Sequence, residues 1–188
     1  MISREKALKL IRKYIKTENT IKHMLAAEAI MRALAKRFKP EKEEAWAMAG
    51  LLHDLDYEVA KEKEHCLKIV EILKKEGVEL PPEILYTIQA HGYNLHPQFE
   101  PKSKMDWALF IADSLTGLIV ATALVRPSKK LADVELKSVK KKFKDKHFAA
   151  GTRRQDIALC EEKLGLSLDE FIQIGLEAVQ GISDDLGL

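Results

Sequence analysis

The spacing of apolar residues predicts helices along most of the chain. Over residues 3–15, apolar side chains recur every three or four positions, which is the period of a helix with one buried face. The same period is found in four further segments, 19–38, 41–55, 62–76 and 81–91. No segment shows the alternation that is typical of a half-buried strand. The pattern therefore predicts an all-α fold.

Residues that begin or end helices stand at the edges of these segments. Ser3 can accept hydrogen bonds from the free backbone N–H groups of the first helix. Pro40 and Gly77 are placed to end two of the others. The stretch from Gly92 to Lys102, which contains two prolines, is long enough to form a lid.

One apolar segment, from Trp107 to Val125, has nearly the length of a membrane span. Its only charged residue is Asp113, and an aspartate at the centre of a bilayer costs about 2.5–3.5 kcal/mol. Hydroxyl residues and a glycine interrupt the apolar run further. We therefore expect a central helix that begins at Ser103, is packed on all sides, and supplies its aspartate with a buried partner.

The charge of the chain changes sign beyond residue 125. Residues 126–147 hold nine Lys or Arg and three acids, whereas residues 155–188 hold eight acids and one Lys. The basic part predicts a short helix at about 135–144. The acidic part predicts one helix that ends before Gly165 and another that is capped by Ser167. We expect the basic helix to be solvated or to pair with the acidic part.

The composition is that of one globular domain comprising residues 1–188. The chain is 46% hydrophobic, and its formal charge of +2 creates no field that would attract nucleic acid. Two cysteines cannot form the disulfide framework of a small secreted protein, and no apolar signal segment follows Met1. We expect a cytoplasmic protein without a membrane or nucleic-acid partner. Its core is expected at about 20–125 and a charged helical extension at 126–188, with the oligomeric state left open.

Histidines and aspartates carry the clearest functional signal. A single His-Asp pair arises easily by chance, so the signal is the whole set. Five predicted helices each place one such residue on an apolar face, namely His23, His53, His65, His91 and Asp113. Two further histidines, His96 and His147, lie in loop-like segments and are expected at the surface.

Burying this set of imidazoles and carboxylates without partners would cost several kcal/mol, on the order of 1–3 kcal/mol for each group. A divalent cation removes that cost, because it supplies positive charge and a partner for each lone pair. Mixed His and Asp ligands suit Fe, Mn, Co, Ni or Zn. Taken one at a time, each histidine is more simply a hydrogen-bonded core residue. Together they predict a site for one or two divalent transition metals.

The order of these residues resembles a known pattern. His23, then the pair His53-Asp54 at the end of a helix, then Asp113 is similar to the H…HD…D pattern of the HD-domain metal-dependent phosphohydrolases. The resemblance covers about residues 20–125. It implies an all-helical bundle with a metal site at its centre, in which these four residues hold one ion.

The resemblance extends to binuclear members of that superfamily. His65 and His91 match their two extra ligand positions, and the aspartate of the His-Asp pair bridges both ions there, so Asp54, His65 and His91 are implied to hold a second ion. Asp56 stands where the His-Asp-x-Gly (HDIG-type) variant has glycine. Tyr57 stands where two narrower branches, the cyclic-dinucleotide phosphodiesterases and the mononucleotidases, have Lys and Glu. The segment after residue 125 is similar to small HD-domain proteins without an assigned substrate.

The implied reaction is hydrolysis of a phosphate ester of a nucleotide or another small phosphorylated metabolite. A bound cation lowers the pKa of its water toward about 7, which gives hydroxide near neutral pH. Asp54 is the first candidate catalytic residue. Asp56 or Glu58 would handle protons or orient a ligand imidazole, or else lie at a solvated helix end. A candidate phosphate clamp follows the central helix, with an exposed charge run as its alternative: Arg126, Lys129 and Lys130.

Two other classes of function stay open at this stage. A site of four histidines and two aspartates also resembles the di-iron oxygenases of the same superfamily. Alternatively, the metal is structural and the basic segment docks an anionic partner. Oxygen consumption distinguishes the first of these from hydrolysis, and retention of a partner after metal loss would favour the second.

Overall fold

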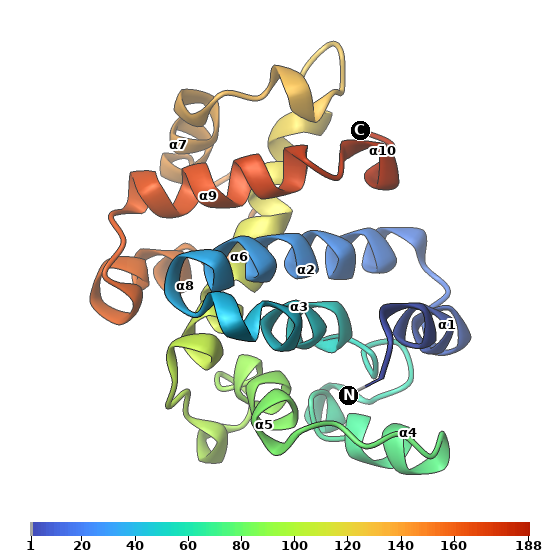
Figure 1. The fold of residues 1–188 in the computed structure, drawn as a ribbon. Coiled ribbons are helices and arrows are strands. Elements are labelled where there is room, and N and C mark those ends of the chain that lie inside the picture. The colour runs from blue at the N-terminus through green and yellow to red at the C-terminus, as the bar shows by residue number, and fades with distance from the viewer. Residues whose placement is uncertain (1) are drawn as a thin grey trace.

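The computed structural model describes residues 2–188 as a bundle of helices, with no strand in that range. This confirms the predicted all-α class. Figure 1 shows the long helix α2 crossing the middle of the molecule, between α9 on one side and α3 on the other. The helices are α1 (Arg4–Tyr14), α2 (Glu18–Phe38), α3 (Glu43–Leu52), α4 (Ile69–Lys75), α5 (Pro82–His91), α6 (Lys104–Leu124), α7 (Leu136–Lys144), α8 (Arg154–Ala158), α9 (Leu168–Gln180) and α10 (Ser183–Leu186).

Helix α6 is the central helix that the apolar segment predicts. It is capped by Ser103, whose hydroxyl accepts from the N–H of Asp106 while the Asp106 carboxylate accepts from the N–H of Ser103. By length and composition it is the one helix in residues 2–188 that could cross a membrane. However, 67% of its apolar window is buried inside the fold, against α2, α5, α7 and α9. Most of this window is therefore covered by protein.

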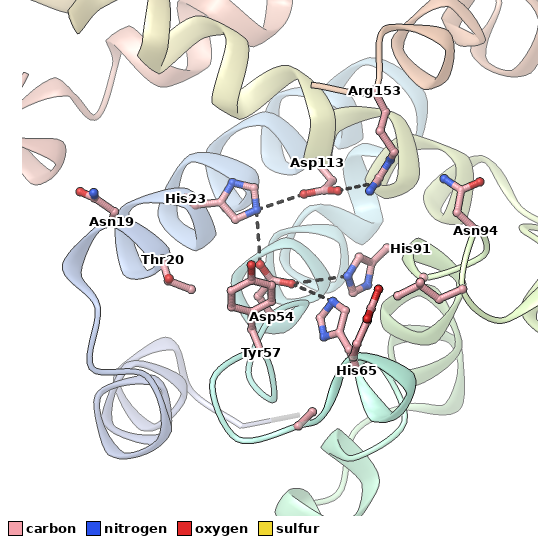
Figure 2. Close-up of a pocket in the computed structure, with 14 residues that line it drawn as sticks. Asn19, Thr20, His23, Asp54, Tyr57, His65, His91, Asn94, Asp113 and Arg153 are labelled. Atoms are coloured by element: carbon pink, nitrogen blue, oxygen red, sulfur yellow. Dashed lines mark hydrogen bonds and ion pairs between the residues drawn. The ribbon is translucent and has the colours of Figure 1, made fainter. Parts of the chain in front are cut away.

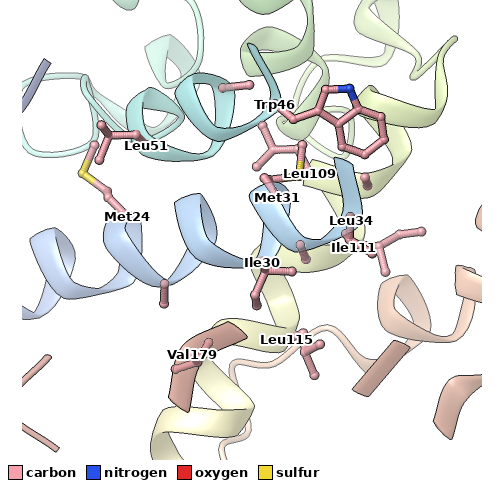
Figure 3. Packing of buried hydrophobic residues seen from close by; sticks show 14 of the residues in the cluster. Met24, Ile30, Met31, Leu34, Trp46, Leu51, Leu109, Ile111, Leu115 and Val179 are labelled. Carbon is pink, nitrogen blue, oxygen red and sulfur yellow. The ribbon is translucent and has the colours of Figure 1, made fainter. Parts of the chain in front are cut away.

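Helices α2 and α3 pack closely because small residues face each other. A Cβ atom added at Gly50 would lie 2.7 Å from the carbonyl oxygen of Ala27, so only glycine permits this approach. Beside this contact, Met24 and Leu51 interlock between the two helices, and Ile30 points toward α6 and α9 (Figure 3). The close approach brings the end of α3 next to the first turns of α2.

The extension beyond residue 125 folds onto the same core. Phe171, Ile172 and Val179 of α9 are fully buried, and a Cβ at Gly175 would lie 2.6 Å from a methyl group of Leu115 in α6. The expected pairing of basic and acidic segments is found in one ion pair, Lys140–Asp169 at 2.6 Å. The short helix α10 has no counterpart in the sequence prediction.

The predicted helix over 62–76 is interrupted. A short 3-10 turn spans Glu62–Glu64, irregular turns follow, and regular helix begins only at Ile69. Cys66 has φ +69°, in the left-handed region that an α-helix cannot include. This break turns the backbone at His65 and presents that side chain to the centre of the molecule instead of along a helix face.

Candidate metal centre

Five separate segments bring six side chains to one place, and Figure 2 shows all of them except His53. One comes from α2, two from the turn after α3, one from the interrupted segment before α4, one from the end of α5 and one from the middle of α6. They are His23, His53, Asp54, His65, His91 and Asp113. Five of them, all except His53, line a cavity of about 750 Å³.

The first group of donor atoms surrounds His23. Its Nε2 lies 3.0 Å from Nε2 of His53 and 3.0 Å from Oδ1 of Asp113. Oδ2 of Asp54 completes the group, at 3.5 Å from His23 and 3.4 Å from His53. Two imidazole nitrogens and two carboxylate oxygens thus surround one small volume.

The second group surrounds the other oxygen of Asp54. Oδ1 lies 3.4 Å from Nε2 of His65 and 3.5 Å from Nε2 of His91. Asp54 therefore turns one carboxylate oxygen toward each group, as the dashed lines in Figure 2 show. This is the arrangement expected of a carboxylate that bridges two ions.

In each of the four histidines Nδ1 already takes part in a hydrogen bond, so Nε2 is the nitrogen that faces the centre of the cluster. Nδ1 of His53 donates to the carbonyl of Gly50 at 2.8 Å, and Nδ1 of His91 donates to the carbonyl of Ile88. Thr116 donates its hydroxyl proton to the carbonyl of Asp113, so it can only accept from Nδ1 of His23, at 2.8 Å.

These tautomers test whether the residues fit a metal. With both Nδ1 atoms protonated, the Nε2 lone pairs of His23 and His53 point at each other across 3.0 Å and toward carboxylate oxygens. Acceptors in such proximity repel one another unless a cation lies between them. A proton removes the repulsion between one pair of these atoms, whereas a divalent cation can interact favourably with all four of them. The donor set of four imidazoles and two carboxylates fits a transition metal, in one or two positions.

In the metal-free cluster, the carboxylates and histidines shift one another's pKa values. Burial would raise the pKa of Asp54 and of Asp113, but the neighbouring histidines outweigh it and hold both pKa values below their usual range. Burial would lower the pKa of His53, but the carboxylates of Asp54 and Asp113 raise it to about 9. Burial lowers the pKa of His91. The carboxylates therefore stay ionised and attract cations.

Asp56 belongs to the support of the site. It is fully buried, and its Oδ1 accepts from Nδ1 of His65 at 2.8 Å while its Oδ2 accepts from the N–H of Ile69 at 3.0 Å. Of the alternatives that the sequence left open for Asp56, this position corresponds to orientation of a ligand imidazole. A carboxylate in this position fixes the ring of His65 and makes its Nε2 a better donor.

Cys66 adds a sulfur atom near the second group. Its Sγ lies 3.6 Å from Nε2 of His91. Burial, with Asp56 and Asp54 nearby, raises the pKa of the Cys66 thiol, which therefore stays protonated in the metal-free protein. A thiol is a poor ligand by comparison with a thiolate, so the nitrogen and oxygen donors define the site.

The structure does not bring the other predicted site residues to the cavity. The Glu58 carboxylate accepts from the N–H groups of Lys16 and Thr17, at 2.7 and 2.9 Å, and so holds the turn between α1 and α2. Arg126 donates to Ser138 at 3.2 Å and lines a separate surface cavity. Lys129 and Lys130 follow it, beyond the end of α6. Asp113 is about 17 Å from that end, at 1.5 Å per residue, so the structure does not bring the expected phosphate clamp to this cavity.

His96 also differs from its prediction. It is 7% exposed, and its Nε2 donates to the carbonyl of His65 at 2.7 Å, which braces the irregular turn on which His65 lies. His147 is exposed, as expected. His96 belongs to no periodic apolar face, so the sequence carried no signal for its burial.

Sequence reasoning missed Arg153, which reaches the cavity from the extension. Its Nη2 donates to Oδ2 of Asp113 at 2.9 Å, and its Nε donates to Oδ2 of Asp156 at 2.6 Å. Asn94, on the cavity wall, donates to the same oxygen of Asp156 at 3.1 Å. Arg153 lies 40 residues from Asp113 in a segment without a motif, so no spacing rule could have found it.

Comparison with known proteins agrees with this geometry. The profile of the HD domain matches residues 20–118, just over half of the chain. The chain belongs to the HD-domain superfamily of metal-dependent phosphohydrolases. The matched segment contains all six clustered side chains and excludes Arg153. Comparisons with curated proteins and with solved structures gave no match.

Proposed function

We propose that this protein is a metal-dependent phosphohydrolase that cleaves a phosphate ester of a nucleotide or another small phosphorylated metabolite. The observation that carries the proposal is the position of Asp54, whose two oxygens face two separate groups of histidines. The cavity of about 750 Å³ beside it lies within the range of small-molecule sites, about 300–1,000 Å³.

The residues that would hold metal fall into the two groups already described. His23, His53, Asp54 and Asp113 would hold one ion, and Asp54, His65 and His91 a second. A divalent metal such as Fe, Mn, Co, Ni or Zn would supply Lewis acidity, lower the pKa of a water molecule and neutralise phosphoryl charge. Thr116, Gly50 and Asp56 hold three of the rings so that each Nε2 faces inward.

The remainder of the cavity wall is suited to an organic group. Tyr57 is 56% exposed and packs edge-to-face against His65, so its free ring face can accept a planar or apolar group. Asn19, Thr20 and Asn94 offer neutral hydrogen-bonding groups. Such a wall suits a small metabolite that carries one phosphate. A cytoplasmic location, where such metabolites are abundant, is part of the proposal.

The test combines metal analysis with an activity panel. Protein purified without chelator is expected to contain metal, with about two ions per chain if both groups bind. Loaded with Mn, Co, Ni or Fe, it is expected to release phosphate or a phosphomonoester from at least one member of a panel of mono- and diesters. Asp54→Asn should lose metal and activity, whereas Arg126→Gln, outside the cavity, should keep both.

The donor set itself favours one second candidate, a di-iron oxygenase. Four histidines and two carboxylates also suit iron that reacts with oxygen. Iron-loaded protein that consumes oxygen with a substrate, and cleaves no phosphate ester anaerobically, would replace the hydrolase proposal. Retention of metal without either activity would indicate a structural metal in a binding module.

A further inference from the structure

The cavity has one cationic side chain among the residues 2–188 that line it, and that side chain is Arg153. It comes from outside the segment that matches the HD domain. Arginine binds phosphate oxygens through strong, charge-assisted hydrogen bonds that are often bidentate. Arg153 is therefore the residue whose role at this cavity has to be explained.

The guanidinium of Arg153 is held from two sides. Asp156 is 4% exposed and is fixed by Asn94, so the contact at Nε is a rigid anchor. The contact at Nη2 is to Oδ2 of Asp113, whose Oδ1 faces His23. Arg153 thus lies directly beside the first donor group, on the opposite oxygen of the same carboxylate.

The backbone around Arg153 is also fixed. The next residue, Arg154, donates to backbone carbonyl oxygens of the loop before it, including Phe143 and Asp145, both at 2.8 Å. This closes the loop from α7 to α8 around one guanidinium. The loop therefore delivers Arg153 to the cavity at a defined position.

The remaining donors of Arg153 are directed at no residue of the described chain. Within residues 2–188 its bonds use Nε and Nη2, and 40% of the side chain is exposed. Nη1 keeps two N–H groups, and Nη2 keeps one. Buried anchors on one edge and free donors on the other are typical of an arginine that recognises a phosphate oxygen.

We propose that Arg153 binds the phosphate group of the substrate, so that the charged extension completes the site built by the HD segment. The inference rests on the proposed hydrolase function and names the residue that recognises its substrate. An alternative role is positional, in which Arg153 only holds Asp113 in place for metal. The two roles differ in what happens to phosphate affinity once metal is bound.

The experiment measures binding of inorganic phosphate to metal-loaded full-length protein by calorimetry, together with metal content per chain. Arg153→Gln is expected to weaken phosphate binding about 10–100-fold with metal content unchanged, because one charge-assisted contact is lost. Arg153→Lys keeps the positive charge but loses the planar, two-pronged guanidinium. Its affinity for phosphate should therefore lie between those of the wild type and Arg153→Gln. Arg126→Gln is the matched control and should bind phosphate like the wild type.

Three results would overturn the proposal: wild-type affinity for phosphate in metal-loaded Arg153→Gln, loss of metal as its only defect, or no phosphate binding by the metal-loaded wild type. If Arg153→Gln does not fold, as judged by its thermal transition, Arg153→Lys decides by the same criteria. Failure of the hydrolase proposal is a separate result, because it shows as wild-type protein that binds phosphate and cleaves no ester.

Discussion

The carboxylate of Asp56 accepts a hydrogen bond from Nδ1 of His65 at 2.8 Å, and this contact positions one half of the metal site. His65 lies in an irregular turn with a left-handed residue next to it, so the backbone alone holds it less firmly than a helix would. The second oxygen of Asp56 accepts from the first N–H of α4 and ties the turn to that helix.

Asp56→Asn should therefore lower the affinity for the second ion, at His65 and His91, more than the affinity for the first. Loss of a carboxylate that orients a ligand histidine costs about 10–100-fold in metal affinity. We expect metal content to fall from about two ions per chain toward one under dilute metal, as measured by elemental analysis after dialysis. Asp133→Asn, at an exposed acid far along the chain, is the control. Equal loss of both ions, or none, would contradict the assigned role of Asp56.

Two glycines offer a paired test of how packing builds the site. A Cβ at Gly50 would lie 2.7 Å from the backbone of Ala27, whereas a Cβ at Gly117 in α6 would meet nothing within 4 Å. Gly50→Ala should force α3 away from α2, lower the free energy of unfolding by about 1–3 kcal/mol, and separate His53 from His23. Gly117→Ala should raise the free energy of unfolding by about 0.5–1 kcal/mol, because alanine favours the helix more than glycine does.

Thermal unfolding and metal titration check this pair. We expect Gly50→Ala to melt several degrees lower than the wild type and to bind metal more weakly, and Gly117→Ala to melt slightly higher with metal affinity unchanged. If Gly50→Ala kept full metal affinity, the close approach of α2 and α3 would not be what positions the first donor group.

Local patterns predicted the helices and most of the inward-facing polar residues. Apolar periodicity placed His23 and Asp113 correctly, because both lie on regular helices whose faces the sequence records. Periodicity failed to predict the backbone at His65, because Cys66 has a left-handed conformation that interrupts the helix. Apolar periodicity could not predict the role of Arg153. The contact of Arg153 with Asp113 joins segments 40 residues apart and depends on how the extension folds back onto the core.

The metal-free protein should lose stability as pH rises through the alkaline range. Asp54 and Asp113 raise the pKa of His53 from 6.5 to about 9, so the folded chain binds a proton there that the unfolded chain releases. That stabilisation is fully present below pH 6.5 and is lost as pH approaches 9, with a slope of up to about 1.4 kcal/mol per pH unit. Burial keeps His91 neutral over most of this range.

Denaturant unfolding of chelator-treated protein between pH 7.5 and 9 measures this slope. His53→Gln should flatten it. Saturating Mn should reverse its sign, because metal competes with protons for the same nitrogen and gains affinity as pH rises. A metal-free wild type whose stability is independent of pH over this range would show that His53 is neutral in the folded protein.

Arg154 should hold in place the loop that carries Arg153, although Arg154 itself does not line the cavity. The five N–H groups of its guanidinium lie within hydrogen-bond distance of six backbone carbonyl oxygens and so hold the loop that carries Arg153. These are the carbonyls of Lys142, Phe143, Asp145, Phe148, Ala149 and Thr152. Arg154→Ala leaves several partly buried carbonyls without donors, so we expect a loss of about 1–3 kcal/mol and faster proteolysis between residues 145 and 152. Metal content should stay unchanged, because all six clustered ligands lie in other segments.

Arg154→Lys, which cannot span the same set of acceptors, should resemble Arg154→Ala. A loop as resistant to protease in Arg154→Ala as in the wild type would mean that its apolar contacts, such as those of Phe143 and Phe148 with the core, hold it instead.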